Sequence, residues 1–448
     1  MKKLIKYTFV LLLIVAGYFA FNTYPKLDIV SGFSSKSIAS HLFIADRAQE
    51  FTEKEDNDVP SMNLASSEVD LVMKSVTSRA LGIKKRKAIF RKGVGVVLLP
   101  VDATIIQDTY LKPNRDKTLK NLRYPYGKLA QKDTFFTNVD YKKLQKAVDD
   151  AFVDTEYEIK KTRSVLVIYK DQIISEKYTQ GFNEKSIFLG WSMAKSVTSA
   201  VLGVLERKGI IALTDNNLFT EWQSDDRKDI TLANLLNMNS GLEWEEDYTK
   251  ICDVTKMLFI ESDMSKVQRV KLLSGTPNES WNYSSGTCNM LSGFIRNQFK
   301  SHQEYLDFWY TELIDKIGMH SMLIETDYSG NYVGSSYAWA TTRDWAKFGL
   351  LYLHNGNWNG EQIINKSWVD FSRKPTNGSD GVYGGHFWLN AGGKFPDVPS
   401  DMYSCNGYQG QYVFIIPSKD LVIVRTGLKE NPDFNVNVFL KEIIGSIE

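Results

Sequence analysis

Two side chains between Gly190 and Ser196 have the types and spacing needed for nucleophilic catalysis. Ser192 is followed three residues later by Lys195, and residues three apart in a helix lie on the same face. A serine hydroxyl becomes a good nucleophile only when a neighbouring group accepts its proton. A lysine accepts that proton when its amine is neutral, and burial disfavours the charged form. The spacing therefore predicts a serine nucleophile with a lysine base.

The residues that follow predict the helix that would carry this pair. Apolar side chains recur at three- and four-residue spacing from Val197 to Leu205, which is typical of a helix with one buried face. Lys208-Gly209 supplies a basic last turn and a glycine stop. Ser192 would then lie at or near the first turn, where the helix N-terminus favours an oxyanion. Ser-x-x-Lys alone is a weak motif, so other parts of the chain must support it.

Composition sets the broad class of the protein. The chain has 448 residues, of which 43% are apolar and 12% aromatic, enough for sizeable cores in one to three domains. The net charge is +1, from 54 basic and 53 acidic residues. Proteins that bind nucleic acid usually carry a basic surplus, so no nucleic-acid partner is expected.

Cysteine and histidine positions argue against a metal centre. Cys252, Cys288 and Cys405 lack metal-ligand spacing, and we expect them to be small buried side chains. An odd number of cysteines argues against a full disulfide framework, although one disulfide stays open if the chain is exported. Four histidines also lack partners at ligand spacing: His41, His302, His320 and His354. The sequence predicts neither a metal site nor a cofactor.

Residues 1–21 have the pattern of a targeting segment. Lys2, Lys3 and Lys6 precede an uncharged, mostly apolar run from Tyr7 to Phe21. Counted from Leu4, the segment just reaches the length that spans a bilayer. No clear cleavage site follows it, and the lysines favour a cytoplasmic N-terminus. We expect a protein anchored in the membrane and facing the periplasmic or extracellular side. A cleaved signal peptide, giving a secreted protein, is the alternative, and a buried helix is a remote third.

The next two parts of the chain precede the main domain. Residues 22–107 are expected to form a small β-rich leader region, and residues 108–138, rich in Lys and Asp with two prolines, a connecting arm. The elements expected in the leader region are extended chain over 31–47, a loop over 50–58, and strands over 69–81 and 87–99 around a turn at 82–85.

Residues 139–448 are expected to form one domain of the α+β (α/β) class. Its order of helix, hairpin and helix predicts an antiparallel sheet flanked by helices, with a helical subdomain at about 210–340. Helices are expected over 141–152, over the Ser192 segment, over 232–241 after a cap at Thr231, and over 305–317, 342–353 and 435–447. Strands are expected over 165–169, 173–178, 384–389, 411–416 and 421–425.

Five segments of this domain occur in an order that is far more specific than one short motif. They are Ser192-Met193-Ala194-Lys195, Ile230 to Gly241, Tyr283-Ser284-Ser285, Ala340 to Gly349, and Gly407-Tyr408-Gln409-Gly410-Gln411. The set resembles the serine β-lactamase-related superfamily, which includes class C β-lactamases, DD-peptidases, esterases and amidases. Within it, the chain is most similar to the 6-aminohexanoate-dimer hydrolase type. The resemblance covers about residues 141–448 and implies a β-lactamase/transpeptidase-like fold.

The resemblance also implies roles for particular residues. Ser192 would form an acyl-enzyme, Lys195 would accept its proton, and Tyr283 would share that proton and pass it to the leaving group. A phenol suits this role because its pKa falls beside a lysine ammonium. Ser285 stands where many relatives have Asn, and it would hydrogen-bond substrate or Lys195. The backbone N–H groups of Ser192 and Gln411 would form an oxyanion hole, typically worth a few kcal/mol.

One motif departs from the family pattern. Tyr408-Gln409-Gly410 stands where relatives often have Lys-Thr-Gly or His-x-Gly. A cation there would help to hold a substrate carboxylate, and Tyr408 supplies none, although Arg425 could compensate. The departure favours a neutral small-molecule amide or ester over a β-lactam or a peptide C-terminus.

Several further residues are candidates for substrate contact. Tyr408 and Gly410 lie in the departing motif, and the amidase branch has a substrate-contacting tyrosine near the place of Tyr248. An ordinary surface tyrosine is the alternative there, and the acidic run before it is expected to be a solvated loop. His386 is a fourth candidate, with a structural histidine as the favoured alternative. Trp339 and Trp388 are expected in the core.

Three other functions compete with an amidase or esterase. The first is a penicillin-binding DD-peptidase or β-lactamase-like enzyme. The second is a membrane-tethered sensor or binding module that does not turn over. The third is an α/β-hydrolase triad of Ser192 with His386, which needs a strand entering the serine turn. We expect no strand to end at Gly190. The sequence does not predict the physiological substrate or the oligomeric state.

Overall fold

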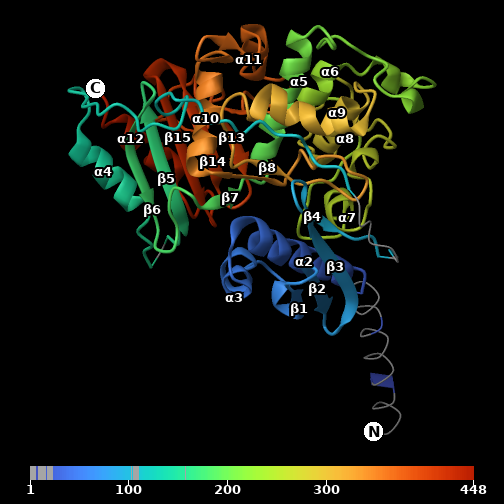
Figure 1. Cartoon of the computed structure of the whole chain (residues 1–448). Coiled ribbons are helices and arrows are strands. Elements are labelled where there is room, and N and C mark those ends of the chain that lie inside the picture. The colour runs from blue at the N-terminus through green and yellow to red at the C-terminus, as the bar shows by residue number, and fades with distance from the viewer. Residues whose placement is uncertain (1–6, 9–16, 18–23, 102, 104–109, 157) are drawn as a thin grey trace.

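The computed structural model describes residues 7–8, 17, 24–101, 103, 110–156 and 158–448 (Figure 1). The expected membrane anchor therefore lies outside the described residues, apart from Tyr7, Thr8 and Gly17. Within the described ranges, no helix has both the length and the apolar character needed to cross a bilayer. The anchor stays a prediction from the sequence.

A six-stranded antiparallel sheet forms the centre of the larger domain, in the order β12-β13-β14-β15-β5-β6 (Figure 1). Its strands are β5 (Thr162–Tyr169), β6 (Gln172–Tyr178), β12 (Trp388–Leu389), β13 (Tyr403–Gly407), β14 (Gln411–Ile416) and β15 (Leu421–Gly427). The first hairpin of the domain pairs with its last strand, so that Val167 lies opposite Ile423. The predicted antiparallel sheet is confirmed, although β12 is shorter than the strand expected over 384–389.

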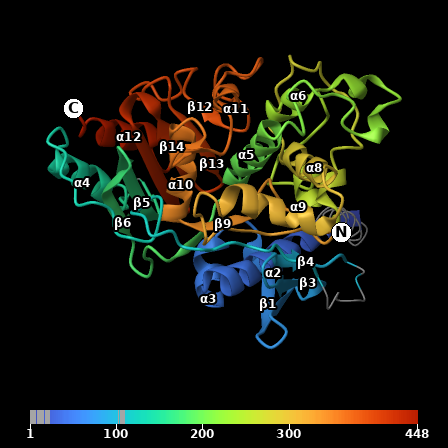
Figure 2. The same cartoon turned by 45° about the horizontal axis from the view of Figure 1, so that its top comes forward.

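Helices cover both faces of this sheet because its central strands alternate between two cores. Leu166 and Ile168 of β5 pack into the core that contains α5 (Met193–Arg207) and α10 (Thr342–Leu353). Val165 and Val167 face the opposite core, which contains α4 (Tyr141–Asp150) and α12 (Val436–Ile444). Successive strand residues point to opposite faces, so an unbroken apolar strand needs cover on both sides. Figure 2 shows α4 and α12 on one side of the sheet and α5 on the other.

The remaining helices lie mostly beside α5 and cover its outer side (Figure 2). They are α6 (Leu232–Leu236), α7 (Asp253–Phe259), α8 (Ser285–Arg296), α9 (His302–Trp309), which continues as a π-helical turn (Tyr310–Ile314), and α11 (Lys366–Ser372). Single turns of 3₁₀ helix lie at Met62–Leu64, Thr220–Trp222, Asp226–Asp229, Met264–Lys266 and Pro417–Lys419. The expected cap of α6 is present, since Thr231 accepts from the Asn234 N–H.

Two small sheets complete the larger domain. A three-stranded antiparallel sheet has the order β7-β9-β8, formed by β7 (Ile187–Leu189), β9 (Ala338–Thr341) and β8 (Leu323–Ile324). The other pairs β10 (Asn357–Trp358) with β11 (Glu361–Gln362). Residues 110–138, the described part of the expected arm, contain no helix or strand.

The leader region contains a long helix where extended chain was predicted. Helix α2 (Lys26–Ala45) replaces the extended segment expected over 31–47. The short helix α3 (Gln49–Phe51) and a π-helical turn (Thr52–Asp56) replace the loop expected over 50–58. Both predictions were wrong. Helix α2 buries serines as well as apolar residues because it packs against the leader sheet and the larger domain together. A helix covered on two sides shows no single apolar stripe.

Each of the two strands predicted in the leader region is split in two. The four strands are β1 (Ala65–Asp70), β2 (Ser75–Ala80), β3 (Ile83–Arg91) and β4 (Gly95–Leu98), paired antiparallel in that order. The central turn consists of Leu81 and Gly82, not of residues 82–85. Both have positive φ, at 52° and 75°, as the tightest hairpin turns require.

A buried carboxylate of the larger domain holds the leader region in place. Glu325 is fully buried, and its Oε1 lies 2.7 Å from Lys36 Nζ on α2. It also accepts from Ser40 Oγ at 3.1 Å and from the Val96 N–H at 2.6 Å. Trp339 Nε1 donates to the same carboxylate from β9. Because these donors come from α2, β4 and β9, the leader region and the larger domain share one polar anchor.

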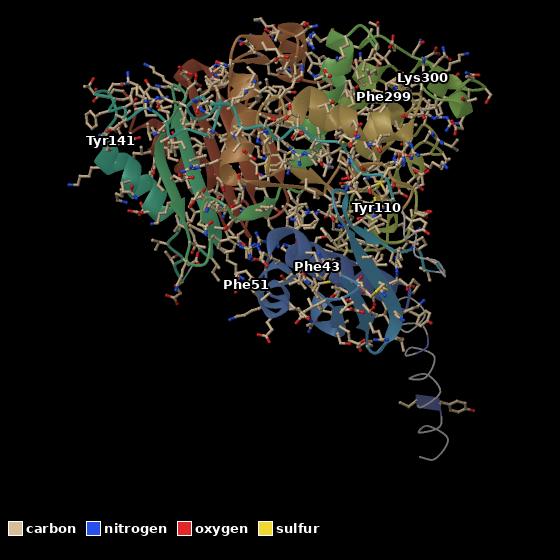
Figure 3. All side chains as sticks on the ribbon, viewed as in Figure 1. Phe43, Phe51, Tyr110, Tyr141, Phe299 and Lys300 are labelled. Atoms are coloured by element: carbon tan, nitrogen blue, oxygen red, sulfur yellow. The ribbon has the colours of Figure 1, made fainter. Side chains whose placement is uncertain are left out.

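A second buried carboxylate docks the other end of the leader region. Asp56 lies 3.0 Å from His41 and 3.1 Å from Arg47, and it receives the guanidinium of Arg163 from β5. Burial alone would raise the pKa of Asp56, but His41 and Arg163 hold it well below the ordinary value. Phe51, which Figure 3 labels, adds a ring contact to the larger domain.

Candidate active site

Ser192 lies at the N-cap of α5, at the end of a tight turn. Strand β7 ends at Leu189, so the expectation that no strand ends at Gly190 was wrong. The turn is compact, because the Gly190 N–H donates to Ala338 O and a Cβ on Gly190 would lie 2.3 Å from the Trp345 ring. The backbone N–H of Ser192 has no acceptor among the residues that the structure describes.

Lys195 lies directly against the Ser192 hydroxyl. Its Nζ is 2.9 Å from Ser192 Oγ, 3.0 Å from Ser285 Oγ and 3.0 Å from the Ser335 carbonyl oxygen. The side chain is only 1% exposed, whereas Ser192 is partly exposed. Three acceptors are as many as one ammonium can serve. The contact predicted from the spacing of Ser192 and Lys195 is therefore present.

Tyr283 lies beside this pair, two residues before α8. Lys195 Nζ is 4.8 Å from the centroid of the Tyr283 ring. On its other side the ring packs against Trp388 and Tyr383, with centroids 5.3 and 5.8 Å away. Trp388, expected in the core, is half-buried and supports this wall of the site. Trp339 is fully buried, as expected.

The charges around Lys195 differ from the sequence-based expectation. Burial by itself lowers the pKa of Lys195, but Tyr283 and Glu246 together raise it above the ordinary lysine value. Burial also raises the pKa of Tyr283, and Glu246 adds to this rise, against the lowering effect of Lys195. The sequence led us to expect lowered pKa values for Lys195 and Tyr283, and both expectations were wrong. At neutral pH the site holds an ammonium beside a neutral phenol.

The turn between β13 and β14 lies against the serine turn. A Cβ on Gly407 would come within 2.0 Å of the Gly190 carbonyl oxygen, so the two backbones touch here. In the strand register Gln411 lies opposite Gly407, which places the proposed second oxyanion donor at this contact. Gly410 has a φ of +78° and a Cβ there would collide with Arg425. Both facts explain why this turn position is a glycine.

Three aromatic side chains, which we call the aromatic rim, flank the Ser192 turn. The rings of Trp191 and Tyr408 have centroids 5.7 Å apart, and Tyr408 stacks on Tyr248 at 6.5 Å. Tyr408 is 42% exposed and Tyr248 is 53% exposed. Both tyrosines therefore present exposed ring surface beside the Ser192 turn, and a substrate contact by either stays a prediction from the sequence.

A comparison of the sequence with known protein families shows to which family the chain belongs. Residues 160–438 match the family described as beta-lactamase. The chain belongs to the beta-lactamase family. This membership confirms the resemblance to the serine β-lactamase-related superfamily and the predicted β-lactamase/transpeptidase-like fold. The leader region lies outside the matched residues. No curated protein matches the chain.

Solved structures agree with this fold. The chain is similar to a "Putative 6-aminohexanoate-dimer hydrolase" from Bacillus anthracis, with 21% identity, a TM-score of 0.58 and coverage of 75% of this chain and 89% of that one. A family VIII carboxylesterase shows 15% identity, a TM-score of 0.54 and coverages of 68% and 96%. A penicillin-binding protein homologue from Caulobacter crescentus shows 11% identity, a TM-score of 0.51 and coverages of 68% and 97%. At these identities the likeness shows the fold alone.

His386 is buried in this member of the beta-lactamase family. Its side chain is 2% exposed, and Nδ1 donates to the Lys195 carbonyl oxygen at 3.0 Å. Burial lowers its pKa to about 3, so the imidazole is neutral. This placement fits the structural histidine that the sequence favoured. An α/β-hydrolase triad does not fit either, because His386 bonds the backbone of α5 and not the Ser192 hydroxyl.

Arg425 does not supply the cation that the departing motif lacks. The guanidinium is fully buried and donates to the carbonyl oxygens of Gly410, Lys429 and Lys160 at 2.6 to 2.7 Å. Burial lowers its pKa to about 9. Nearer the site, Lys394 is exposed and lies 5.6 Å from the centroid of the Trp388 ring. Sequence reasoning did not single out Lys394.

Cysteine placement agrees with the sequence. Cys252, Cys288 and Cys405 are buried and unpaired, and burial raises the pKa of Cys288 to about 12. Within the described ranges, no group of three or more His, Cys, Asp and Glu side chains is placed to hold a metal ion.

Glu246 is a second residue near the site that sequence reasoning missed. The acidic run before Tyr248 was expected to be a solvated loop, yet the carboxylate of Glu246 accepts from Ser285 Oγ at 2.5 Å. It also accepts from Trp244 Nε1 and from the Tyr248 hydroxyl. The alternation of Trp244, Glu246 and Tyr248 was the available signal, since residues two apart in extended chain share a side.

The charge state of Lys195 predicts that activity rises with pH. Only the neutral amine can accept the Ser192 proton, and the raised pKa keeps Lys195 charged at neutral pH. Below that pKa, each pH unit increases the neutral fraction about tenfold. We expect kcat/KM for a neutral ester to rise from pH 6 through pH 9, after subtraction of spontaneous hydrolysis. A rate that falls between pH 7 and 9 would contradict this assignment of the base.

The contact between Gly407 and Gly190 predicts that a larger residue at position 407 lowers ester turnover. Gly407→Ala would force the β13–β14 turn away from Ser192, because its Cβ would overlap the Gly190 carbonyl oxygen. Moving a group at a reacting centre by about 1 Å can lower the rate about 100-fold. We expect that loss in ester turnover, with Glu442→Ala as the control because the Glu442 side chain is exposed. Wild-type ester turnover in a folded Gly407→Ala variant would show that this contact does not position the catalytic residues.

Proposed function

We propose that this protein is a serine hydrolase that cleaves an amide or ester bond through an acyl-enzyme on Ser192. The observation that carries the proposal is the 2.9 Å contact between Lys195 Nζ and Ser192 Oγ in a buried site. It supplies the paired nucleophile and base that acyl transfer needs. The partial exposure of Ser192 leaves its hydroxyl open to a substrate.

The proposed reaction has two steps. Ser192 Oγ attacks the substrate carbonyl carbon while its proton passes to neutral Lys195, and the N–H groups of Ser192 and Gln411 bind the oxyanion. Tyr283 takes this proton from Lys195 and passes it to the departing amine or alcohol, so that the C–N or C–O bond breaks and an ester on Ser192 remains. Water then attacks that ester, which releases a carboxylic acid and restores the serine hydroxyl.

The proposed substrate is a neutral small molecule. Tyr248, Tyr408 and Trp191 offer ring surface near Ser192, and Tyr408 replaces the cation that would hold a substrate carboxylate. Arg425 is fully engaged with backbone carbonyls. A carboxylate substrate would therefore depend on Lys394 at the edge of the site.

A substrate panel tests this proposal. Purified protein would be assayed with p-nitrophenyl esters, a linear secondary amide and a chromogenic cephalosporin. We expect turnover of the neutral esters or the amide, with the cephalosporin slower. A faster cephalosporin would overturn the neutral preference, and Lys394→Ala would then test whether this lysine holds the carboxylate. Acylation by a penicillin without release would instead favour the peptidase or sensor alternative.

We also propose that residues 1–21 tether the enzyme to the membrane on its exported side. The support is the sequence pattern of three lysines before an apolar run. Fractionation of cells that express the full chain would test this. The full chain is expected with the membranes until detergent is added, and release by high salt alone would contradict the tether.

A further inference from the structure

Glu246 is bound by donors on every side. Its Oε1 accepts from Ser285 Oγ at 2.5 Å and from the Tyr248 hydroxyl at 3.0 Å. Its Oε2 accepts from Trp244 Nε1 at 2.5 Å and from the Ser285 N–H at 2.9 Å. An ionised carboxylate only accepts hydrogen bonds, and charge-assisted bonds are the strong ones. The four donors therefore hold the carboxylate in one orientation at the N-terminus of α8.

This arrangement fixes the direction of the Ser285 hydroxyl. A serine hydroxyl has one proton, and here Glu246 takes it, so Ser285 Oγ can only accept from Lys195. The second fixed acceptor is the Ser335 carbonyl oxygen. A neutral lysine amine has two N–H groups and one lone pair. When both N–H groups point at these acceptors, the lone pair points at Ser192 Oγ.

We propose that Glu246 is the positioning residue of the general base: by holding Ser285 as an acceptor, it directs the lone pair of neutral Lys195 at the Ser192 hydroxyl. This inference rests on the proposed serine hydrolase function and deepens it. Without Glu246, the Ser285 hydroxyl is free to turn and donate to the Lys195 lone pair. The base would then be occupied at the moment it must accept the serine proton.

The same carboxylate influences the pH dependence of the site. The titratable groups that face Lys195 are Glu246 on the loop after α6, Tyr283 just before α8, Cys288 within α8, and His386 before β12. Glu246 raises the pKa of Lys195. Removal of its charge lowers that pKa, so the rising limb of the activity profile should move to lower pH.

Three variants of the full chain test the inference. Glu246→Gln keeps the size of the side chain and removes its charge, Glu246→Ala removes the acceptor, and Glu245→Gln is the matched control. Glu245 is exposed and pairs with Lys250 at the surface. For a neutral ester we expect Glu246→Ala to lose up to about 100-fold in kcat, with little change in KM. Glu246→Gln should lose less, because its amide oxygen can still accept from Ser285. The Glu246→Gln profile should also shift to lower pH, and the control should match wild type.

A double variant separates positioning from a merely structural role. If Glu246 acts through Ser285, then Glu246→Ala should cost little more in kcat once Ser285→Ala is already present. Additive losses, or wild-type kcat and pH profile in folded Glu246→Gln, would overturn the inference. Should Glu246→Ala not fold, the isosteric Glu246→Gln in the Ser285→Ala background gives the same comparison. A wild-type protein that does not acylate Ser192 would instead overturn the proposed function itself.

Discussion

Replacing Lys195 by alanine is expected to lower kcat/KM for a neutral ester by about 1,000-fold, the middle of the range for a positioned acid–base group. Lys195 is buried, with its Nζ 2.9 Å from Ser192 Oγ. The variant keeps the serine and the aromatic rim but has no group to accept the serine proton. Steady-state kinetics at pH 8, with the thermal midpoint as a check on folding, measure this effect.

Two further substitutions sharpen the Lys195 result. Lys195→Arg should not restore activity, because a guanidinium stays protonated and cannot act as the base. Lys185→Ala should behave as wild type, since Lys185 is exposed. Loss of a general base lowers the rate by about 100-fold or more. A folded Lys195→Ala variant that kept more than about a tenth of wild-type kcat/KM would therefore show that Lys195 is not the base.

Glu325→Ala is expected to destabilise the protein by about 3–5 kcal/mol, the usual cost of removing one partner of a buried ion pair. The substitution would leave Lys36 buried without its counter-charge. It would also leave the Val96 N–H and Trp339 Nε1 without their acceptor. Urea unfolding followed by tryptophan fluorescence would measure the change in free energy of unfolding.

A surface pair provides the control for Glu325. Glu361 lies 2.8 Å from Lys316 at the surface, so Glu361→Ala should change stability by less than about 1 kcal/mol. A Glu325→Ala effect no larger than this would contradict the role of Glu325 as the anchor of the leader region.

Loss of this anchor should also reduce activity. Phe33 of α2 packs in the same apolar cluster as Trp191 and Trp244. Trp191 precedes the nucleophile, and Trp244 donates to Glu246. The leader region therefore supports the floor of the site, and a folded domain without residues 22–107 is not expected to be active.

Local spacing made the core of the site predictable. Ser192 and Lys195 are three residues apart at the start of a helix, so their contact needs no knowledge of the fold. Tyr283 is distant in the chain, and only the order of five family segments identified it. Strands β5, β14 and β15 were predictable because each is an unbroken apolar run bounded by turns.

The failed predictions concern contacts between distant segments. Helix α2 is buried on two sides, so it shows no apolar stripe of the helical period. Glu246 looks like part of a solvated acidic run until α8 brings Ser285 against it. The pKa direction of Tyr283 was wrong because its burial, aided by Glu246, outweighs the effect of Lys195. That of Lys195 was wrong because Tyr283 and Glu246 both raise it. Charge effects depend on distances in space, which the order of residues does not give.

The most direct measurement is the intact mass of the protein after treatment with a fluorophosphonate, for wild type and Ser192→Ala side by side. A fluorophosphonate forms a stable bond with an activated serine hydroxyl, so it reports the nucleophile whatever the natural substrate is. We predict that wild type gains the mass of one probe and that Ser192→Ala gains none. A wild-type protein without adduct, or an adduct that persists in Ser192→Ala, would contradict Ser192 as the nucleophile.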